Sequence, residues 1–377
     1  MKNRLYNLDA LRFIAAWIVL LCHVEVVKRY FGIIQNTDPF FINSAQIAVT
    51  FFFVLSGFLI TWLLLIEKRK AGEGKIGLWR FYRKRILRIW PLYYLVIFLG
   101  FFLLRQISFF NDVVHTNYFN GTKHHIALIY YILFLPNYSE FCFGTPLYIG
   151  QVWSLGVEEF FYLFFPVIIY FIPLRRISSF LIGSGILFIV LSVLIRVILE
   201  GSPHRFGQLL FVYADKYRLY SFTLGGLAAC FYINTDRMTD LKKYLSKRSM
   251  GYGLLVLTFV LILTGRTFSI VTQQAYSLLF ALLLLSVLLS GIKPWLLNNS
   301  VSVYLGKISY GIYMLHAIAI IIVLKGIYPS LATNVNWINS IVIYLLATLI
   351  TIGLAMISWH FYETFFLRFR IKRNKSE

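Results

Sequence analysis

Ionisable residues lie inside the apolar stretches of this sequence. Arg12 and His23 are eleven residues apart in the apolar segment 8–27, a spacing of about three helical turns. Both side chains are therefore expected on one face of a membrane helix, about 16 Å apart along its axis. Because charge at such depth is costly without a partner or a wet cavity, the pair indicates a functional site. The alternative is that Arg12 reaches the headgroups and His23 joins two helices.

Two further ionisable side chains are expected near the depth of His23, in the outer half of the bilayer. Glu158 lies near the outer end of the fourth apolar segment, and His316 lies within the ninth. A carboxylate beside an imidazole can fix its tautomer and stabilise the imidazolium, an arrangement that suits a general base. We therefore predict His23 as a general base partnered by Glu158, with His316 as a candidate third member. A structural contact between helices is the alternative reading of each.

Arg85 and Arg88 are three residues apart before the third apolar segment, so they share a helical face. Two guanidinium groups on one face suit a phosphate-bearing ligand that enters from the cytoplasm, whereas anchoring at the headgroups is the alternative. Ser56 and Gly57 are small residues that favour close approach of another helix. The sharper alternative makes Ser56 a nucleophile, for which the sequence assigns no base. No carboxylate–histidine pair has metal-ligand spacing on one helix, so no metal is expected.

Ten apolar segments of roughly membrane-crossing length position these residues. Apolar residues make up 59% of the 377, which predicts an all-α, polytopic bundle forming a single membrane domain, 1–377. The expected spans are 8–27, 47–66, 89–105, 152–173, 179–199, 219–233, 250–265, 275–291, 303–323 and 339–363. The apolar segment 126–137 is too short to span alone, and we expect it to be a re-entrant or interfacial part of a long outer loop, 106–151.

Basic clusters decide the expected orientation. The net charge of +21 is concentrated in short stretches between apolar segments, the pattern of cytoplasmic loops that face anionic lipid. If 126–137 does not cross, the clusters fall on one side with both termini in the cytoplasm; they are 67–88, Arg175 with Arg176, 237–248 and 368–375. This distribution argues against nucleic-acid binding. The first segment carries charges and lacks a cleavage site, so we do not interpret it as a cleavable signal peptide.

Six motifs in sequence order, over residues 7 to about 368, resemble the acyltransferase-3 family of membrane acyltransferases. They are Arg12 with His23, FFFVLSGFLIT, Arg85-Ile-Leu-Arg88, WSLGVEEFFYLFFP, ISYGIYMLH and FYETFFLRF. The resemblance implies a bundle of about ten helices in the cell (plasma or inner) membrane. It also implies transfer of an acyl group, usually acetyl from acetyl-CoA, to a hydroxyl of a cell-envelope carbohydrate or related acceptor.

The resemblance also assigns residues. Arg12 and His23 match the family's arginine and histidine of the first helix, Arg85 and Arg88 match its arginine pair, and Glu158 matches the glutamate after WSL-x-V. Many members have Glu-x-Pro-Phe, whereas here Glu363 is followed by Thr364 and Phe365. Many also have an acidic residue two positions after an arginine in the middle helices, whereas here Tyr220 stands at that distance from Arg218. These departures leave the roles of Glu363 and Arg218 open. We expect no hydrolase-like extracytoplasmic domain of the kind that is fused to some members.

The sequence thus predicts an O-acyltransferase that uses acetyl-CoA or another acyl-CoA as co-substrate. The nucleotide end of the donor is expected near Arg85 and Arg88, with Arg12 stabilising the donor inside the bundle. His23 would accept the proton of the acceptor hydroxyl, assisted by Glu158; an acyl-histidine relay is the alternative chemistry.

The outer loop is expected to help select a carbohydrate or lipid-linked acceptor, through residues such as Tyr118, His124, His125 and Tyr138. Neither the acceptor nor the oligomeric state follows from the sequence. A rival hypothesis is a transporter or flippase for an envelope precursor that uses the same buried charges. A donor-binding sensor without turnover is a third.

Overall fold

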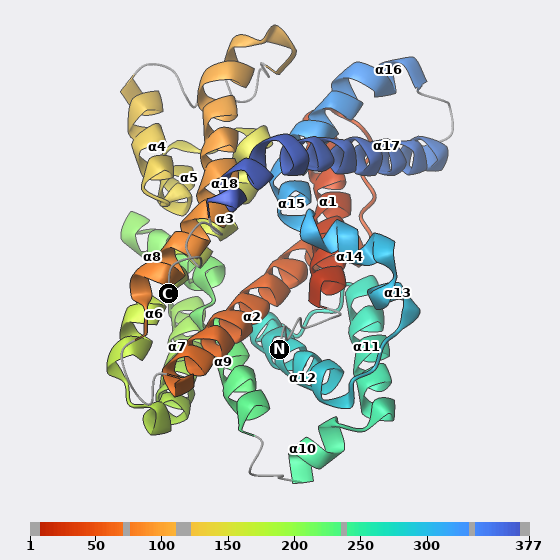
Figure 1. Cartoon of the computed structure of the whole chain (residues 1–377). Helices are drawn as coiled ribbons and strands as arrows, with labels where there is room; N and C mark the ends of the chain where they lie inside the picture. Colours follow the sequence, from red (N-terminus) through yellow and green to blue (C-terminus); the bar gives the residue numbers. More distant parts are fainter. Residues whose placement is uncertain (1–7, 71–75, 111–121, 235–239, 332–335, 370–377) are drawn as a thin grey trace. The chain divides into compact units, whose positions relative to one another are not determined.

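The computed structural model describes residues 8–70, 76–110, 122–234, 240–331 and 336–369 (Figure 1). Within these ranges every regular element is a helix, and an isolated bridge between Phe268 and Ile270 is the one β-type pairing. The predicted all-α class is therefore confirmed. Helices are the expected solution because each satisfies its own backbone polar groups in hydrocarbon.

Eight helical segments in the described ranges are long and apolar enough to cross a membrane. They are Leu8–Tyr30, Pro39–Lys70, Leu78–Gln106, Leu147–Phe171, Leu174–Leu199, Ser269–Ser290, Ser309–Ser330 and Trp337–Arg368. The remaining two expected spans are shorter helices, α9 (Leu219–Ile233, 15 residues) and α11 (Arg248–Leu263, 16 residues). The polytopic architecture is confirmed. That α9 and α11 both cross, and that both termini are cytoplasmic, stay predictions.

The chain forms two compact units, each assembled from separate stretches of sequence. The first unit contains Met1–Leu8, Ile42–Leu78 and Val157–Asn299, and the second contains Asp9–Phe41, Trp79–Gly156 and Ser300–Glu377. The single membrane domain expected over 1–377 depends on how these units are joined, and it stays a prediction.

In the first unit, α9 packs against α7 and α12. The helices of this unit are most of α2 (Pro39–Lys70) and α6 (Trp153–Phe171), with α7 (Ile177–Leu199), α8 (Arg205–Tyr217), α9, α10 (Asp240–Leu245), α11, α12 (Thr272–Ser290) and α13 (Trp295–Asn298). Glycines let α2 and α9 approach closely, because a Cβ on Gly57 would lie 2.1 Å from the Phe222 carbonyl oxygen. The packing role predicted for Gly57 is confirmed.

In the second unit, α1, α15 and α17 share a buried core (Figure 1). The helices of this unit are α1 (Leu8–Tyr30), α3 (Leu78–Phe98), α4 (Thr122–Ile132), α5 (Pro136–Phe143), α14 (Ser300–Lys307), α15 (Ser309–Ile321), α16 (Tyr328–Leu331), α17 (Asn336–Ile357) and α18 (Thr364–Arg368). Leu20 and Val24 of α1 meet Ile320 and Ile343 in this core. The core places the histidine of α1 beside that of α15.

The structure corrects several expected boundaries. Helix α3 begins at Leu78, so the carboxyl-terminal half of the expected loop 67–88 is helical, consistent with the good helix propensity of Lys and Arg. The expected span 303–323 is broken at Ile308, between α14 and α15. The stretch 126–137 contains the end of α4, an 11-residue helix. At about 16 Å, α4 is too short to cross about 30 Å of hydrocarbon alone, which supports the expected non-spanning role.

Candidate active site

Two histidines from helices distant in sequence meet inside the second unit. The His23 Nδ1 atom of α1 lies 2.6 Å from the His316 Nε2 atom of α15. Their rings are nearly parallel, with centroids 4.9 Å apart and an interplanar angle of 22°. His316 is fully buried. The structure therefore brings together two of the three groups that the sequence placed at one depth.

Hydrogen bonding assigns the tautomer of both rings. His316 Nδ1 lies 2.7 Å from the backbone carbonyl oxygen of Tyr313, which can only accept, so this nitrogen carries the hydrogen. A neutral imidazole has one N–H, so His316 Nε2 is an acceptor. The nitrogen that faces it, His23 Nδ1, must then donate. The remaining ring nitrogen, His23 Nε2, is left with its lone pair, as a general base requires.

Residues at the start of α6 and just before it bind the turn of α15 that carries His316. Tyr313 Oη makes hydrogen bonds with Ser154 Oγ at 2.6 Å and with the Gln151 carbonyl oxygen at 3.1 Å. Gln151 Nε2 donates to the backbone carbonyl oxygen of Met314 at 2.6 Å. These contacts orient Tyr313, whose carbonyl sets the His316 tautomer. Because they join residues far apart in sequence, no local pattern indicates them.

A buried ion pair fixes α1 just beyond His23. Lys28 Nζ lies 2.9 Å from Glu25 Oε1, and the residues are 1% and 3% exposed. From α17, Tyr344 Oη donates to Glu25 Oε1 at 2.5 Å, and Ser340 Oγ accepts from Lys28 at 3.1 Å. The pair sets the rotation of α1 and hence the direction of His23. Sequence reasoning missed it, although the three-residue spacing of opposite charges was a usable signal.

Arg12 lies on the same uninterrupted helix as His23, so the expected separation along the axis holds. Its guanidinium pairs with Asp9, with Nη1 and Oδ1 3.0 Å apart and both side chains about a quarter exposed. Arg12 is therefore partly neutralised near the start of α1. Its predicted contact with the donor stays a prediction.

Glu158 and Ser56 both belong to the first unit, where Tyr162 connects them. Tyr162 Oη donates to Glu158 Oε2 at 2.6 Å and lies 2.9 Å from Ser56 Oγ. Because the carboxylate takes the single phenolic hydrogen, Ser56 must donate to Tyr162. This links Ser56 to a carboxylate that sequence reasoning had not assigned to it. His23 belongs to the second unit, so its predicted contact with Glu158 stays a prediction.

The predicted donor arginines, Arg85 and Arg88, lie within α3. The Arg85 guanidinium is 5.8 Å from the Phe81 ring centroid, and the exposed Arg88 interacts electrostatically with the buried carboxylate of Glu363. Ser358 and Glu363 are the first and last residues of a π-helical stretch. Ser358 Oγ donates to Glu363 Oε1 at 3.1 Å. The negative charge of Glu363 therefore favours the positive charge of Arg88 without forming a salt bridge with it. The predicted binding of phosphate by Arg85 and Arg88 stays a prediction.

Arg218, whose role the sequence left open, is a buried clamp in the first unit. It lies between α8 and α9 with φ +39°. Nε donates to the Asp215 carbonyl oxygen at 2.8 Å. Nη1 donates to Thr50 Oγ1 at 2.8 Å, and Nη2 donates to Gln46 Oε1 at 2.5 Å. These bonds join the α8–α9 turn to α2, which is a structural role.

The expected acceptor loop is described in part. Tyr118 lies outside the described residues. His124 is buried, with its ring 5.1 Å from that of Phe101. Burial, together with the smaller effect of the positive charges of Arg105 and His125, lowers the pKa of His124 to about 4. Tyr138 packs on Tyr130 at a ring distance of 4.8 Å.

Within the part of the chain that the structure describes, no group of three or more His, Cys, Asp or Glu residues has a geometry that could hold a metal ion. A hydrogen-bonded chain that leaves one imidazole nitrogen basic suits the removal of a proton from an alcohol.

Comparison with known proteins identifies the family. A family model described as an acyltransferase domain, acyltransferase-3, matches residues 5–360. This chain belongs to that acyltransferase family. The resemblance drawn from the six motifs is thus confirmed. The match includes every predicted site residue: Arg12, His23, Ser56, Arg85, Arg88, Glu158 and His316.

Relatives of this acyltransferase include a Staphylococcus aureus (strain COL) protein named as a putative O-acetyltransferase, 28% identical over 385 residues. That alignment covers 97% of this chain and 58% of the relative, so the chain spans little more than half of the staphylococcal protein. A protein of the Acidianus two-tailed virus, named as a putative acetyltransferase, is 26% identical over 265 residues, covering 68% of this chain and 71% of the relative. No solved structure matches the chain.

Proposed function

We propose that this acyltransferase is an O-acyltransferase of the cell (plasma or inner) membrane. It transfers an acyl group, acetyl being the simplest case, from acyl-CoA to a hydroxyl of a cell-envelope carbohydrate or a related lipid-linked acceptor. The observation that carries the proposal is the 2.6 Å contact between His23 Nδ1 and His316 Nε2, with the Tyr313 carbonyl setting the tautomers. The family membership and the names of the relatives support the type of reaction.

In the proposed reaction, His23 Nε2 accepts the proton of the acceptor hydroxyl as the oxygen attacks the thioester carbonyl carbon. A C–O bond forms and the carbon–sulfur bond of the donor then breaks. The imidazolium returns its proton to the leaving thiolate, so the products are the acyl ester and CoA with a free thiol. His316 holds His23 in the tautomer that makes Nε2 the base, and the positive charge of the imidazolium is shared along the hydrogen bond.

The charged groups outside the histidine pair have proposed roles toward the donor. Arg85 and Arg88 bind the phosphates of the CoA moiety at the cytoplasmic end of α3, because guanidinium groups on one face match phosphate oxygens. Arg12 stabilises negative charge that develops on the donor within the low-dielectric passage. Glu158 contributes by orienting or charging His23. Each role is a proposal that a single substitution can test.

The test is acyl transfer by the full chain in native-like membranes. Vesicles containing the protein are supplied with radiolabelled acetyl-CoA and a cell-envelope glycan fraction, and free CoA thiol and labelled glycan are both measured. We expect His23→Ala to lower transfer by about 10²- to 10⁴-fold, the usual contribution of a general base. The matched control is His360→Ala, because His360 is an exposed histidine on the π-helical stretch of the same unit.

Two results would count against the proposal. Full transfer by His23→Ala would remove the base from the mechanism. Movement of a lipid-linked glycan across the vesicle membrane, without any release of CoA thiol by the unaltered chain, would favour the flippase hypothesis. Comparison of envelope glycans from cells with and without the gene then identifies the acceptor through the acetyl group that is lost.

A further inference from the structure

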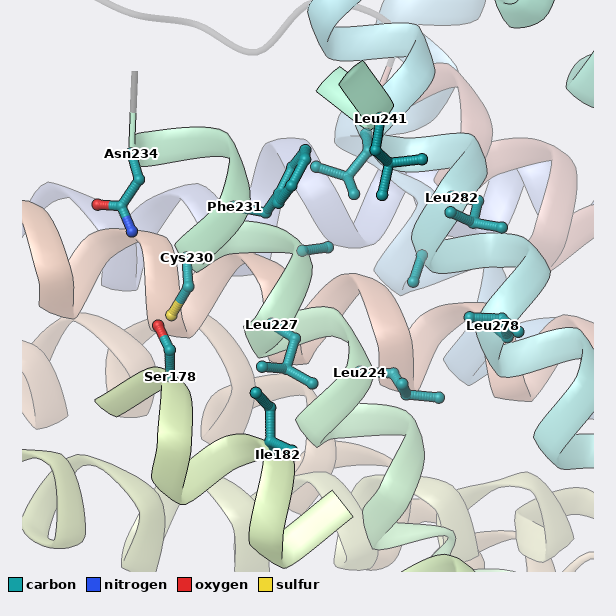
Figure 2. Close-up of a pocket in the computed structure, with 13 residues that line it drawn as sticks. Ser178, Ile182, Leu224, Leu227, Cys230, Phe231, Asn234, Leu241, Leu278 and Leu282 are labelled. Atoms are coloured by element: carbon teal, nitrogen blue, oxygen red, sulfur yellow. The ribbon is translucent and has the colours of Figure 1, made fainter. Parts of the chain in front are cut away.

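The first unit contains an apolar groove of about 440 Å³ that the acyl-transfer chemistry does not use (Figure 2). It is formed by α7, α9, α10 and α12, and its volume lies in the range of ligand pockets, about 300–1,000 Å³. Its walls are aliphatic: Figure 2 shows Ile182, Leu224, Leu227 and Leu278 around the space between the helices. A surface of this kind accommodates a hydrocarbon chain and offers nothing to a free phosphate or sugar.

One end of the groove is polar. Ser178 and Cys230 face each other there, with Asn234 at the end of α9 (Figure 2). Two cations converge on Asn234: Arg69 Nη2 donates to its Oδ1 atom at 2.6 Å, and Lys242 Nζ donates to its carbonyl oxygen at 2.9 Å. The groove thus combines apolar walls with a basic rim.

Helix capping alone does not account for the rim. The carbonyl groups at the carboxyl end of α9 attract cations, and Arg69 Nη1 contacts the Ile233 carbonyl oxygen at 3.3 Å. A guanidinium group has five N–H donors, however, and these two bonds are the ones Arg69 makes among the described residues. No described carboxylate lies within salt-bridge distance of this exposed side chain. An exposed guanidinium with more donors than these two bonds use can also contact an anion.

The orientation predicted from the basic clusters puts this rim in the cytoplasmic leaflet. Arg69 lies in the last turn of α2, at the start of the basic cluster 67–88, and Lys242 lies in the basic stretch 237–248. The cytoplasmic leaflet carries the anionic lipids that attract such residues. A ligand with an acyl chain for the groove and a phosphate for the rim matches both halves of the site.

We propose that the groove binds one anionic phospholipid of the cytoplasmic leaflet. An acyl chain lies between α7, α9 and α12, and the phosphate contacts the exposed Arg69, while the buried Lys242 adds positive charge next to Asn234. The proposal does not depend on acyl transfer, because none of these residues belongs to the proposed active site. It assigns the first unit a specific lipid that occupies the gap between its helices.

The experiment is native mass spectrometry of the delipidated full chain, titrated with dioleoylphosphatidylglycerol or with dioleoylphosphatidylcholine. We expect one tightly bound phosphatidylglycerol and weaker phosphatidylcholine binding. Leu227→Trp fills the groove and should abolish this binding, whereas Val256→Trp, at an exposed position of α11, should preserve it. Arg69→Gln should weaken phosphatidylglycerol about fivefold without changing phosphatidylcholine, the usual effect of one cation near an anionic surface.

Arg69→Gln changes an exposed residue, so it keeps the proposal testable if Leu227→Trp does not fold. Arg266→Gln, an exposed arginine of the same unit, is its matched control and should leave the affinity unchanged. Equal affinity for the two lipids, or unchanged phosphatidylglycerol binding by Arg69→Gln, would overturn the proposal. Displacement of the lipid by palmitoyl-CoA at lower concentration than by phosphatidylglycerol would assign the groove to an acyl donor and would also overturn it.

Discussion

Replacing His316 separates a catalytic role of the histidine pair from a structural one. His316→Phe preserves an aromatic ring in the fully buried position but removes both ring nitrogens. The acceptor of the 2.6 Å hydrogen bond from His23 Nδ1 is lost, and the Tyr313 carbonyl no longer dictates the tautomer. His316→Gln is the conservative variant, because its amide can donate to Tyr313 and accept from His23.

The hydrogen bonds set the size of the expected effect. Leaving a buried donor without an acceptor costs about 1–3 kcal/mol, which is an upper range for the partly buried His23 Nδ1–H. This cost favours the other His23 tautomer, in which Nε2 carries the hydrogen and cannot accept a proton. At 1.36 kcal/mol for each factor of ten, the rate then falls by about 5- to 150-fold. His23→Ala should cost more, about 10²- to 10⁴-fold, because the base itself is gone. His316→Gln should recover much of the rate.

The assay is release of CoA thiol from acetyl-CoA, with kcat and KM determined separately for each variant in vesicles. The effect of His316→Phe should fall on kcat, because the histidine pair is not expected to bind the donor. The double variant His23→Ala with His316→Phe should be no slower than His23→Ala, since His316 acts only through His23. Recovery of the folded protein by gel filtration controls for misfolding.

The expected coupling would be refuted if the double variant lost kcat by the product of the two single losses. This result would mean that His316 supports the fold or another step, independently of the base. An equal loss of rate in His316→Gln and His316→Phe would likewise show that the hydrogen-bonding groups of His316 are immaterial.

Three further predictions follow from the geometry. Arg85→Gln with Arg88→Gln should raise the KM for acetyl-CoA at least tenfold with little change in kcat, since a hydrogen bond to a charged group contributes about 1.5–3 kcal/mol. Gly225→Ala should lower the free energy of unfolding by about 1–3 kcal/mol, because its Cβ would lie 1.9 Å from the Val54 carbonyl oxygen, and thermal unfolding followed by circular dichroism measures this. His124→Gln should reduce the loss of stability in acid. The pKa of His124 is about 4 in the folded protein and about 6.5 in the unfolded chain, so the unfolded chain binds the proton more tightly. The contribution of His124 to stability is therefore complete above pH 6.5 and declines toward pH 4.

Each of these predictions has its own control. For the arginine pair the control is Arg80→Gln, which changes an exposed residue of the same helix. An unchanged KM in the Arg85 and Arg88 double variant would show that the pair anchors the helix at the headgroups instead of binding the donor. For Gly225 it is Gly253→Ala, where nothing lies within 4 Å of the added Cβ, so the helix should be unaffected or slightly stabilised. For His124, equal loss of thermal stability between pH 7 and pH 4.5 in variant and parent would contradict the expectation.

Local sequence already determined the class of fold and the family. The thickness of the hydrocarbon core demands long apolar runs, so the eight long apolar helices could be located by composition alone. Helical periodicity put Arg12 and His23 on one helix at the expected separation. The six ordered motifs sufficed for the acyltransferase-3 resemblance that the family match confirms.

The helix boundaries were less predictable, since polar and basic turns continue a helix beyond the hydrocarbon. Helix α2 begins at Pro39 rather than near residue 47, and α3 begins at Leu78 rather than near residue 89. Helix α8 was not expected, because it is amphipathic rather than continuously apolar. Apolar composition marks the crossing part of a helix but not its ends.

Only the tertiary structure decided which ionisable groups meet. His23 and His316 are 293 residues apart, and the Tyr313 carbonyl that fixes their tautomers is a backbone group that no residue pattern marks. The rotation of α1 that aims His23 depends on Glu25 and on Tyr344 of α17. Periodicity specifies the face of a single helix, whereas packing between distant helices specifies what that face contacts. The sequence by itself therefore identified the candidate base, and the fold identified the partner that leaves its Nε2 atom with a lone pair.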